Sequence, residues 1–264
     1  MSVDTPATPP LSSLEMRGHI GVIFLLDPAR RNALSIALIS GVLEALKQSR
    51  AEGARAIVIT SASAPFCAGA DIGEMLNSGW LTARASDPAA PTPLDLFKAL
   101  ESDPRLVIAA VDGMVLGGGV ELALSCDMVL ASEEATFALP EIGLGVIPNT
   151  AMARLPALVG VRVAKELILT RRRFSASEAR EMGLVNRVLP RAELIDQAVA
   201  LATSVVVSSP PGAIAAVKAG MRQSTDWPGV TALLDTMNPE EWAEGFDAFL
   251  GKRKPAYDRF WNER

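Results

Sequence analysis

Hydrophobic and polar positions divide the chain into an alternating first part and a mostly helical second part. Three continuous apolar runs, rich in β-branched residues, predict buried strands at 20–26, 56–60 and 106–111. Between the first two runs, apolar positions recur at helical spacing over 36–50, and Ser35 stands where it can cap that helix. Strands and helices that alternate in this way predict an α/β fold with a layered core.

From about Asn149 onward the pattern is mostly helical. Ser175 and Glu178 form a capping box ahead of a short helix, and a last strand is expected at 185–188. Because this helical tail is too short for an independent domain and its faces are mixed, we expect it to pack against another subunit. Its expected helices lie at about 191–207, 211–223 and 239–250.

Two segments lack a regular pattern. Residues 1–14 are expected to form a flexible leader, and residues 1–10 lack the charged and apolar regions of a signal peptide and the Arg of a transit peptide. Residues 77–93 mix Asn, Gly, Pro, Ser and Thr, which predicts a long surface loop. A loop of that length is either a functional lid or disordered, and the sequence does not separate these two interpretations.

Composition narrows the class of protein. The 264 residues are enough for one substantial core, and the formal charge of −5 argues against a nucleic-acid or anionic-membrane partner. Two cysteines are too few for a disulfide framework and fit a reducing compartment. The longest apolar candidate for a membrane span, 106–131, is interrupted by three acidic residues. We therefore expect a soluble, cytoplasmic protein without nucleic-acid or membrane partners.

Histidine is almost absent, and this excludes several kinds of site. His19 is the only histidine, so a His-rich zinc site is impossible, and its place before an apolar run is typical of a residue that enters a strand. Cys67 and Cys126 have no histidine nearby in the sequence and are interpreted as small buried residues. We expect the chemistry to come from carboxylates and the backbone, with no metal.

The most informative segment is a run of three glycines, 117–119, which follows a buried strand and opens an apolar helix ahead of a short strand at 128–131. Glycines let a ligand approach main-chain N–H groups, and the first N–H groups of a helix have no partner within it. The spacing is not G-x-G-x-x-G and no Lys-Ser/Thr follows, so an oxyanion site is preferred to a nucleotide site. A tight turn where two backbones cross explains the triplet equally well.

Glu121 and Glu141 are acidic residues in apolar surroundings. A buried carboxylate is unfavourable unless it has partners, and its pKa is displaced. Taken singly, Glu121 is explained as a first-turn residue that complements a helix dipole, and Glu141 as a solvated loop acid. Two such glutamates on either side of one glycine turn are better explained as an acid–base pair.

Four ordered motifs resemble those of the enoyl-CoA hydratase/isomerase (crotonase) superfamily, and the resemblance extends from about Ile20 to Phe260. One match alone would be weak, but four in order are specific. The motifs are Arg31–Leu34 with Phe66–Met75, Gly117–Ala123 with Cys126–Asp127, Pro140–Gly145, and Glu244–Lys254.

The resemblance implies a spiral of ββα units over residues 15–200, which would contain the coenzyme A and active sites. A helical C-terminal region, residues 201–264, would assemble homotrimers, often paired into hexamers. The resemblance also implies that the N–H groups of Ala70 and Gly118 form an oxyanion hole for the thioester carbonyl.

The same matching suggests where coenzyme A would bind. Ala68, Asp71 and Ile72 lie where the backbone of the family lines the adenine pocket. Arg30 and Lys252 are candidate phosphate contacts, with Lys252 reaching a neighbouring subunit. Coenzyme A is part of the acyl-CoA substrate, so the resemblance implies no separate cofactor.

Both glutamate positions of the hydratases are filled, which implies hydration of a trans-2-enoyl-CoA to a 3-hydroxyacyl-CoA. Glu121 would activate water and Glu141 would protonate the α-carbon. Two alternatives stay open: isomerisation or another reaction that uses Glu141 alone, and a catalytically silent coenzyme A-binding or assembly protein.

The chain departs from the family pattern at Asn149–Met152, where the family commonly has a glycine-rich turn. We expect this segment to change the acyl pocket or the hold on the catalytic water. The sequence does not predict the length or branching of the acyl chain.

Overall fold

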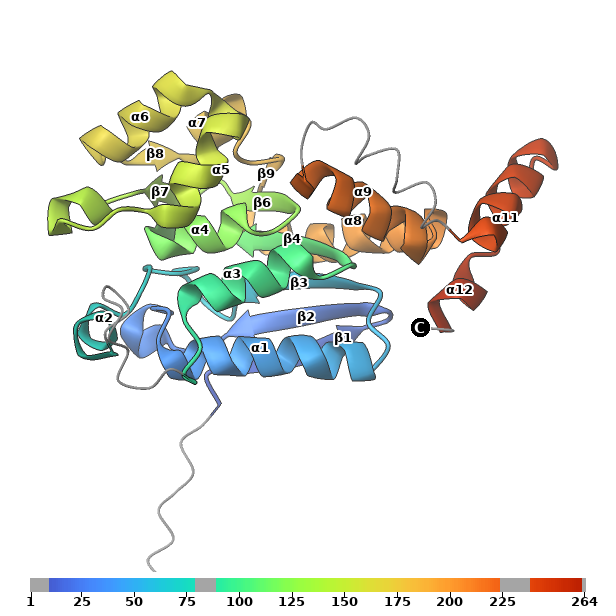
Figure 1. Cartoon of the computed structure of the whole chain (residues 1–264), viewed down its shortest axis with the longest axis horizontal. Helices are drawn as coiled ribbons and strands as arrows, with labels where there is room; N and C mark the ends of the chain where they lie inside the picture. The colour runs from blue at the N-terminus through green and yellow to red at the C-terminus, as the bar shows by residue number, and fades with distance from the viewer. Residues whose placement is uncertain (1–9, 79–88, 224–237, 263–264) are drawn as a thin grey trace, which may run out of the picture.

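The computed structural model describes residues 10–78, 89–223 and 238–262, and a six-stranded sheet forms its centre (Figure 1). In chain order the strands are β1 (Ser12–Arg17), β2 (Ile20–Leu25), β3 (Ala56–Ser61), β4 (Leu106–Val111), β5 (Met114–Leu116), β6 (Met128–Ser132), β7 (Thr136–Ala138), β8 (Phe174–Ser175) and β9 (Arg187–Leu189). The main sheet has the order β1-β2-β3-β4-β6-β9, and a smaller sheet has the order β5-β7-β8. In the main sheet only β1 and β2 pair antiparallel.

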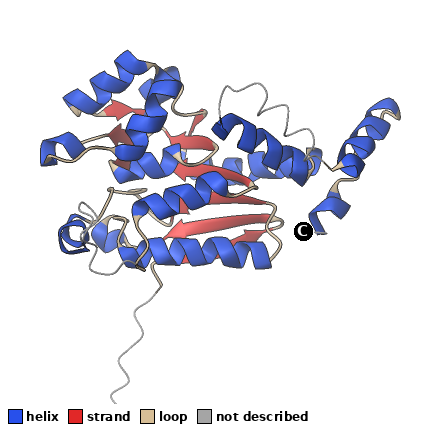
Figure 2. Ribbon diagram, in the orientation of Figure 1, coloured by secondary structure: helices blue, strands red, loops and turns tan. Residues whose placement is uncertain are grey.

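Helices cover both faces of the main sheet. In chain order the described helices are α1 (Ile36–Ala51), α2 (Ile72–Ser78), α3 (Pro93–Ser102), α4 (Gly118–Leu124), α5 (Asn149–Val159), α6 (Val161–Thr170), α7 (Ala176–Glu181), α8 (Leu194–Ser208), α9 (Pro211–Gln223), α11 (Pro239–Leu250) and α12 (Asp258–Asn262). Figure 2 shows α1, α3 and α4 one above another in front of the strands. On the other face, α8 contacts β2, β3, β4 and β6.

The core has two apolar layers, because alternate residues of each strand point to opposite faces of the sheet. Ile57 and Ile59 pack in the layer that includes α1, whereas Val58 packs in the layer that includes α8. Parallel strands buried on both faces need apolar residues at nearly every position. This explains why the strand sequences are continuous apolar runs.

Several elements predicted from the sequence are confirmed. The Ser35 hydroxyl accepts a hydrogen bond from the Leu38 N–H and caps α1, and the capping box at the start of α7 is formed in both directions. The expected helices at 211–223 and 239–250 are α9 and α11. Cys67 is buried, and burial raises the pKa of its thiol to about 12, as expected of a small core residue.

Other expectations were wrong in part. Residues 12–14 do not belong to a flexible leader, because β1 begins at Ser12 and pairs with β2 along its whole length. The error arose because β1 alternates polar and apolar residues and has no continuous apolar run. The last strand lies at β9, Arg187–Leu189, rather than at 185–188. Of the expected loop at 77–93, the first two residues belong to α2 and the last begins α3; residues 79–88 lie outside the described residues.

The C-terminal helices α11 and α12 extend beyond the sheet at one end of the molecule (Figure 1). Arg55, the residue before β3, forms an ion pair with Asp258 at the start of α12. Glu241 of α11 accepts a hydrogen bond from the Gly212 N–H in the first turn of α9. These contacts connect the C-terminal helices to β3 and α9.

The described residues contain neither a single membrane-spanning helix nor a metal-binding cluster of side chains. No single helix there has the length and hydropathy needed to cross a membrane. Two consecutive helical segments, 191–208 and 211–222, reach that length and hydropathy only when taken together, and they are bent by 111° relative to each other. In the same residues, no group of three or more His, Cys, Asp or Glu side chains could hold a metal ion.

Candidate active site

The loop that follows β3 is held between two other backbone segments. On one side the Leu34 N–H donates to the Gly69 carbonyl at 2.7 Å, and on the other the Leu116 N–H donates to the Cys67 carbonyl at 3.0 Å. These bonds place Gly69 and Ala70 directly beside the glycine run that follows β5.

Each glycine of this run meets a different neighbour. Gly117 has a φ of +52°, and a Cβ atom there would stand 2.8 Å from Oε1 of Glu141. A Cβ atom on Gly118 would stand 3.2 Å from the Ala70 nitrogen, and one on Gly119 would stand 2.5 Å from the Cys67 carbonyl oxygen. The run therefore serves both purposes proposed from the sequence: two backbones cross at Gly119, and Gly117 and Gly118 keep side chains out of a site.

The main-chain nitrogens of Ala70 and Gly118 lie close to each other, as the contact between Gly118 and the Ala70 nitrogen shows. A second distance supports this: a Cβ atom on Gly69, the residue before Ala70, would stand 3.3 Å from the Gly118 nitrogen. Within the described parts of the chain, neither N–H donates to a protein acceptor. Two free donors side by side are suited to hold one oxygen atom that gains negative charge.

Glu121 lies in the first turn of α4 and is buried. Its Oε1 atom accepts hydrogen bonds from the N–H groups of Thr150, at 2.7 Å, and Ala151, at 3.0 Å. Burial raises the pKa of this carboxyl group, and the two hydrogen bonds oppose that rise because they stabilise the charged form. Among the described residues no donor contacts Oε2, so that oxygen is free to act on a ligand.

Glu141 begins a short 3-10 turn, η2 (Glu141–Leu144), after the strand β7. Both of its carboxyl oxygens are buried and have no hydrogen-bond partner among the described residues. Burial raises the pKa of Glu141 to about 7, and the negative charge of Glu121 adds to the rise. At neutral pH a large share of this group is therefore protonated and able to donate a proton.

The two glutamates thus form a coupled pair in different environments. Glu121 has two N–H donors that favour its anion, whereas Glu141 is approached, among the described residues, only by its own backbone N–H, which lowers its pKa less than burial raises it. This difference favours Glu121 as the base and Glu141 as the acid. Such an arrangement can take a proton from one atom of a ligand and give a proton to another.

The residues expected to bind coenzyme A lie together, with one exception. The Ala68 N–H donates a hydrogen bond to the carbonyl of Arg31, the residue after Arg30. Asp71 caps the first turn of α2, and Ile72 is the exposed first residue of that helix. Arg30 forms an ion pair with Asp27 and lies 3.7 Å from Asp71. Its guanidinium is about half exposed but already faces carboxylates, so a phosphate would have to compete with them.

Lys252 is the exception. It is exposed and lies two residues beyond the end of α11, whereas Ile72 lies in α2 at the opposite end of the long axis (Figure 1). Within one chain, this lysine does not approach the other candidate residues. Its expected contact with a neighbouring subunit stays a prediction.

A cavity of about 610 Å³ lies at the C-terminal end of α4, away from the glycine run. Its lining includes Leu124, Arg154 and Lys218, and none of the site residues described above. Lys218 pairs with Asp127, and Arg154 pairs with Glu101, so these charged groups already have partners. The cavity therefore does not contain the chemistry of the site.

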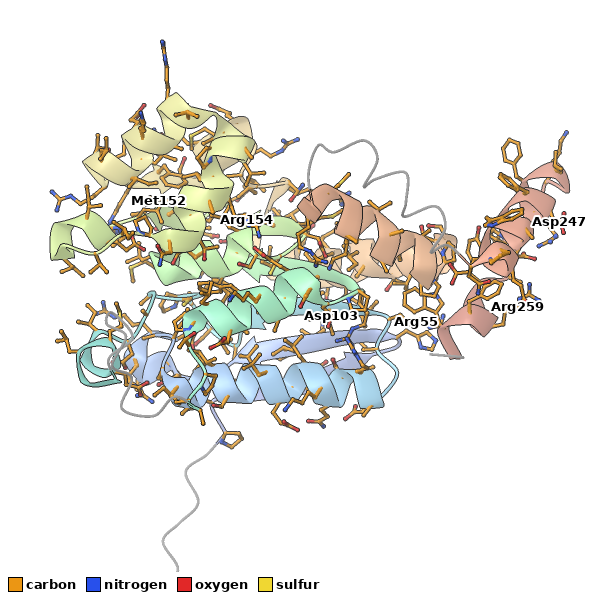
Figure 3. The ribbon with its side chains drawn as sticks, in the orientation of Figure 1. Arg55, Asp103, Met152, Arg154, Asp247 and Arg259 are labelled. Carbon is orange, nitrogen blue, oxygen red and sulfur yellow. The ribbon has the colours of Figure 1, made fainter. Side chains whose placement is uncertain are left out.

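The sequence did not predict which groups hold Glu121. The donors are main-chain N–H groups at the start of α5, which any residue except proline provides, so the residue types at 150 and 151 carry no signal. The departure at Asn149–Met152 does coincide with this contact. The Met152 side chain itself is about half exposed on α5 (Figure 3).

The fold and the site together define a mixed α/β protein of the crotonase type, in which a glycine run lies beside two glutamates. The chain belongs to the enoyl-CoA hydratase/isomerase family, whose model matches residues 15–259.

Individual proteins agree with this assignment. The chain is 34% identical to the short-chain-enoyl-CoA hydratase of Clostridium acetobutylicum, over 91% of this chain and 95% of that protein. It is 36% identical to the 2,3-dehydroadipyl-CoA hydratase of Escherichia coli, over 89% of this chain and 94% of that protein. The crystal structure of an enoyl-CoA hydratase from Bacillus anthracis superposes with a TM-score of 0.81 and 33% identity, over 94% of this chain and 98% of that one.

Proposed function

We propose that this protein is an enoyl-CoA hydratase, which adds water across the 2,3 double bond of a trans-2-enoyl-CoA to give a 3-hydroxyacyl-CoA. The observation that carries the proposal is the pair of glutamates in unlike environments beside two free N–H groups. The proposal is also supported by relatives that are named as hydratases of CoA thioesters and are about 35% identical over most of the chain.

In the proposed reaction Glu121 removes a proton from water as the water oxygen bonds to C3 of the substrate. The electron pair of the double bond moves to form an enolate, whose oxygen accepts hydrogen bonds from the N–H groups of Ala70 and Gly118. Glu141 then gives its proton to C2, and the carbonyl reforms. Glu121 ends protonated and Glu141 ionised, so one proton must return to Glu141 before the next turnover.

Coenzyme A binding in this proposal uses the backbone of Ala68, Asp71 and Ile72, with Arg30 beside them. The phosphate contact of Lys252 would come from a second copy of the chain, because one chain holds it at the opposite end from α2. We therefore propose a homotrimer, or a pair of trimers, as the active form. No cofactor apart from the substrate's own coenzyme A enters the reaction.

Two variants test the roles of the glutamates. Glu121→Gln and Glu141→Gln should each lower the hydration of crotonyl-CoA by at least about 10²-fold while thioester affinity stays within a few-fold. Unchanged turnover in either variant would exclude the assigned role. If Glu121→Gln still isomerised a 3-enoyl-CoA and the wild type did not hydrate, the reaction would be isomerisation through Glu141 alone.

A further inference from the structure

The base Glu121 is held by a helix to which it does not belong. The N-cap residue of α5 is Pro148, which has no side-chain group to accept a hydrogen bond, so the first N–H groups of α5 need an acceptor from elsewhere. Oε1 of Glu121 supplies it by accepting from Thr150 and Ala151, the second and third residues of α5. The position of this carboxylate therefore depends on where α5 begins.

An ion pair joins the N-terminal part of α5 to α3. Arg154, one turn beyond Ala151, donates from Nε to Oε1 of Glu101 at 2.9 Å and from Nη2 to Oε2 of the same carboxylate. A fork of two parallel hydrogen bonds restricts both direction and distance more strongly than a single contact does. Figure 3 shows Arg154 on α5.

Glu101 has a second anchor, because its main-chain carbonyl accepts a hydrogen bond from Arg222 of α9. Its side chain is about four-fifths buried, whereas that of Arg154 is about 39% exposed. The acceptor half of the ion pair is therefore fixed on the body of the protein. The arginine half holds α5 to it.

We propose that the Glu101–Arg154 ion pair is a positioning device for Glu121: it keeps the first turn of α5 where its N–H groups hold Oε1 and leave Oε2 free for water. This inference rests on the proposed function, in which Glu121 is the base. Arg154 and Glu101 touch no reacting atom, so both are positioning residues.

Loss of the ion pair has a chemical consequence besides a mechanical one. If the first turn of α5 moves, Glu121 loses donors that favour its anion, while its burial remains. The titratable group on a neighbouring element is Glu141 on η2, whose pKa is raised by the charge of Glu121; below pH 7 Glu141 carries its proton and is neutral, so it does not oppose this change. Glu121 would then become protonated at higher pH than in the wild type.

The test uses Glu101→Gln and Arg154→Met in the full-length protein, with crotonyl-CoA as the substrate. We expect kcat to fall about 10-fold with KM changed less than about twofold, because a small displacement of a catalytic group affects the rate more than binding. The acid limb of the kcat profile should move to higher pH. Arg154→Lys, which keeps the charge but loses the fork, should recover only part of kcat.

A matched control is the ion pair Arg172–Glu166, in which Arg172 also pairs with Glu178 of α7; these contacts involve neither Glu121 nor the first turn of α5. Arg172→Lys and Glu166→Gln should leave kcat and its pH profile unchanged. In a Glu121→Gln background, Arg154→Met should lower the residual rate no further, because the positioning acts only through Glu121.

The outcomes separate the two proposals. If the wild type does not hydrate any enoyl-CoA, the proposed function fails, and the inference fails with it. If the wild type hydrates and Glu101→Gln and Arg154→Met behave like the controls, the function stands and the inference is overturned. An equal loss of rate in the Glu121→Gln background, or a loss without a pH shift, would also overturn it, since either result indicates only weaker packing. Should Arg154→Met not fold, Glu101→Gln and Arg154→Lys decide the same question.

Discussion

The carboxyl group of Glu141 lies against Gly117, so closely that a Cβ atom on that glycine would stand 2.8 Å from Oε1. The same glycine has a φ of +52°, in the region that favours residues without a side chain. Glu141, the proposed acid, can therefore occupy this position only because residue 117 has no Cβ atom.

Gly117→Ala should displace Glu141 or the glycine run. We expect hydration to fall about 10²-fold or more, and the free energy of unfolding to fall by about 1–3 kcal/mol from backbone strain. Steady-state kinetics and urea unfolding measure the two effects. Gly53→Ala is the control, because Gly53 also has a positive φ but a Cβ atom there meets nothing within 4 Å. Equal kinetic effects in both variants would contradict this account.

The rate of hydration should depend on pH through the pair of glutamates. Because the acid must carry a proton and its pKa is about 7, we expect kcat to fall as pH rises through 7, by about tenfold per unit above it. On the acid side kcat should fall when Glu121 gains a proton. A kcat profile from pH 5 to pH 9 checks both limbs. A rate that stays constant up to pH 9 would exclude Glu141 as the acid.

The raised pKa of Glu141 should also appear in stability. The unfolded chain loses this proton near pH 4.5, whereas the folded protein keeps it up to about 7, so the stability of the wild type relative to Glu141→Gln should fall as pH rises between these values. Discounted for partial exposure, the change is on the order of 1 kcal/mol. Urea unfolding of both proteins at pH 4.5 and pH 8 measures it. A difference that does not change with pH would contradict the buried acid.

Lys252→Ala should weaken substrate binding without changing the chemical step. If the lysine contacts a phosphate of coenzyme A across a subunit boundary, KM for crotonyl-CoA should rise about 3–10-fold with kcat nearly constant, as expected of a partly exposed charged contact. Lys254→Ala is a nearby control of the same type. Equal KM values in the wild type and Lys252→Ala would remove this residue from the site.

Much of the fold was readable from the sequence because burial on both faces produces continuous apolar runs, as at 56–61 and 106–111. The strand β1 was missed because it lies at an edge of the sheet and buries only one side. Side chains with rare chemistry, such as Glu121 and Glu141, were found for the same reason: charged groups among apolar residues are conspicuous.

Backbone chemistry could not be read in the same way. The donors to Glu121 are N–H groups 29 and 30 residues away along the chain, and only the fold brings them to the carboxylate. The ion pair between Glu101 and Arg154 spans 53 residues and carries no local pattern. Contacts of this kind depend on how α3, α4 and α5 pack, which the order of residues along one helix does not specify.

The bond between Glu121 and α5 gives one carboxylate two duties. A lineage that gave up this acid would also leave two amide hydrogens of α5 unsatisfied, and would need a new acceptor to start that helix. The catalytic role and the structural role of Glu121 are therefore lost together when the residue is replaced by one that has no acceptor. A glutamine, whose amide oxygen can still accept, separates the two duties, whereas an alanine removes both.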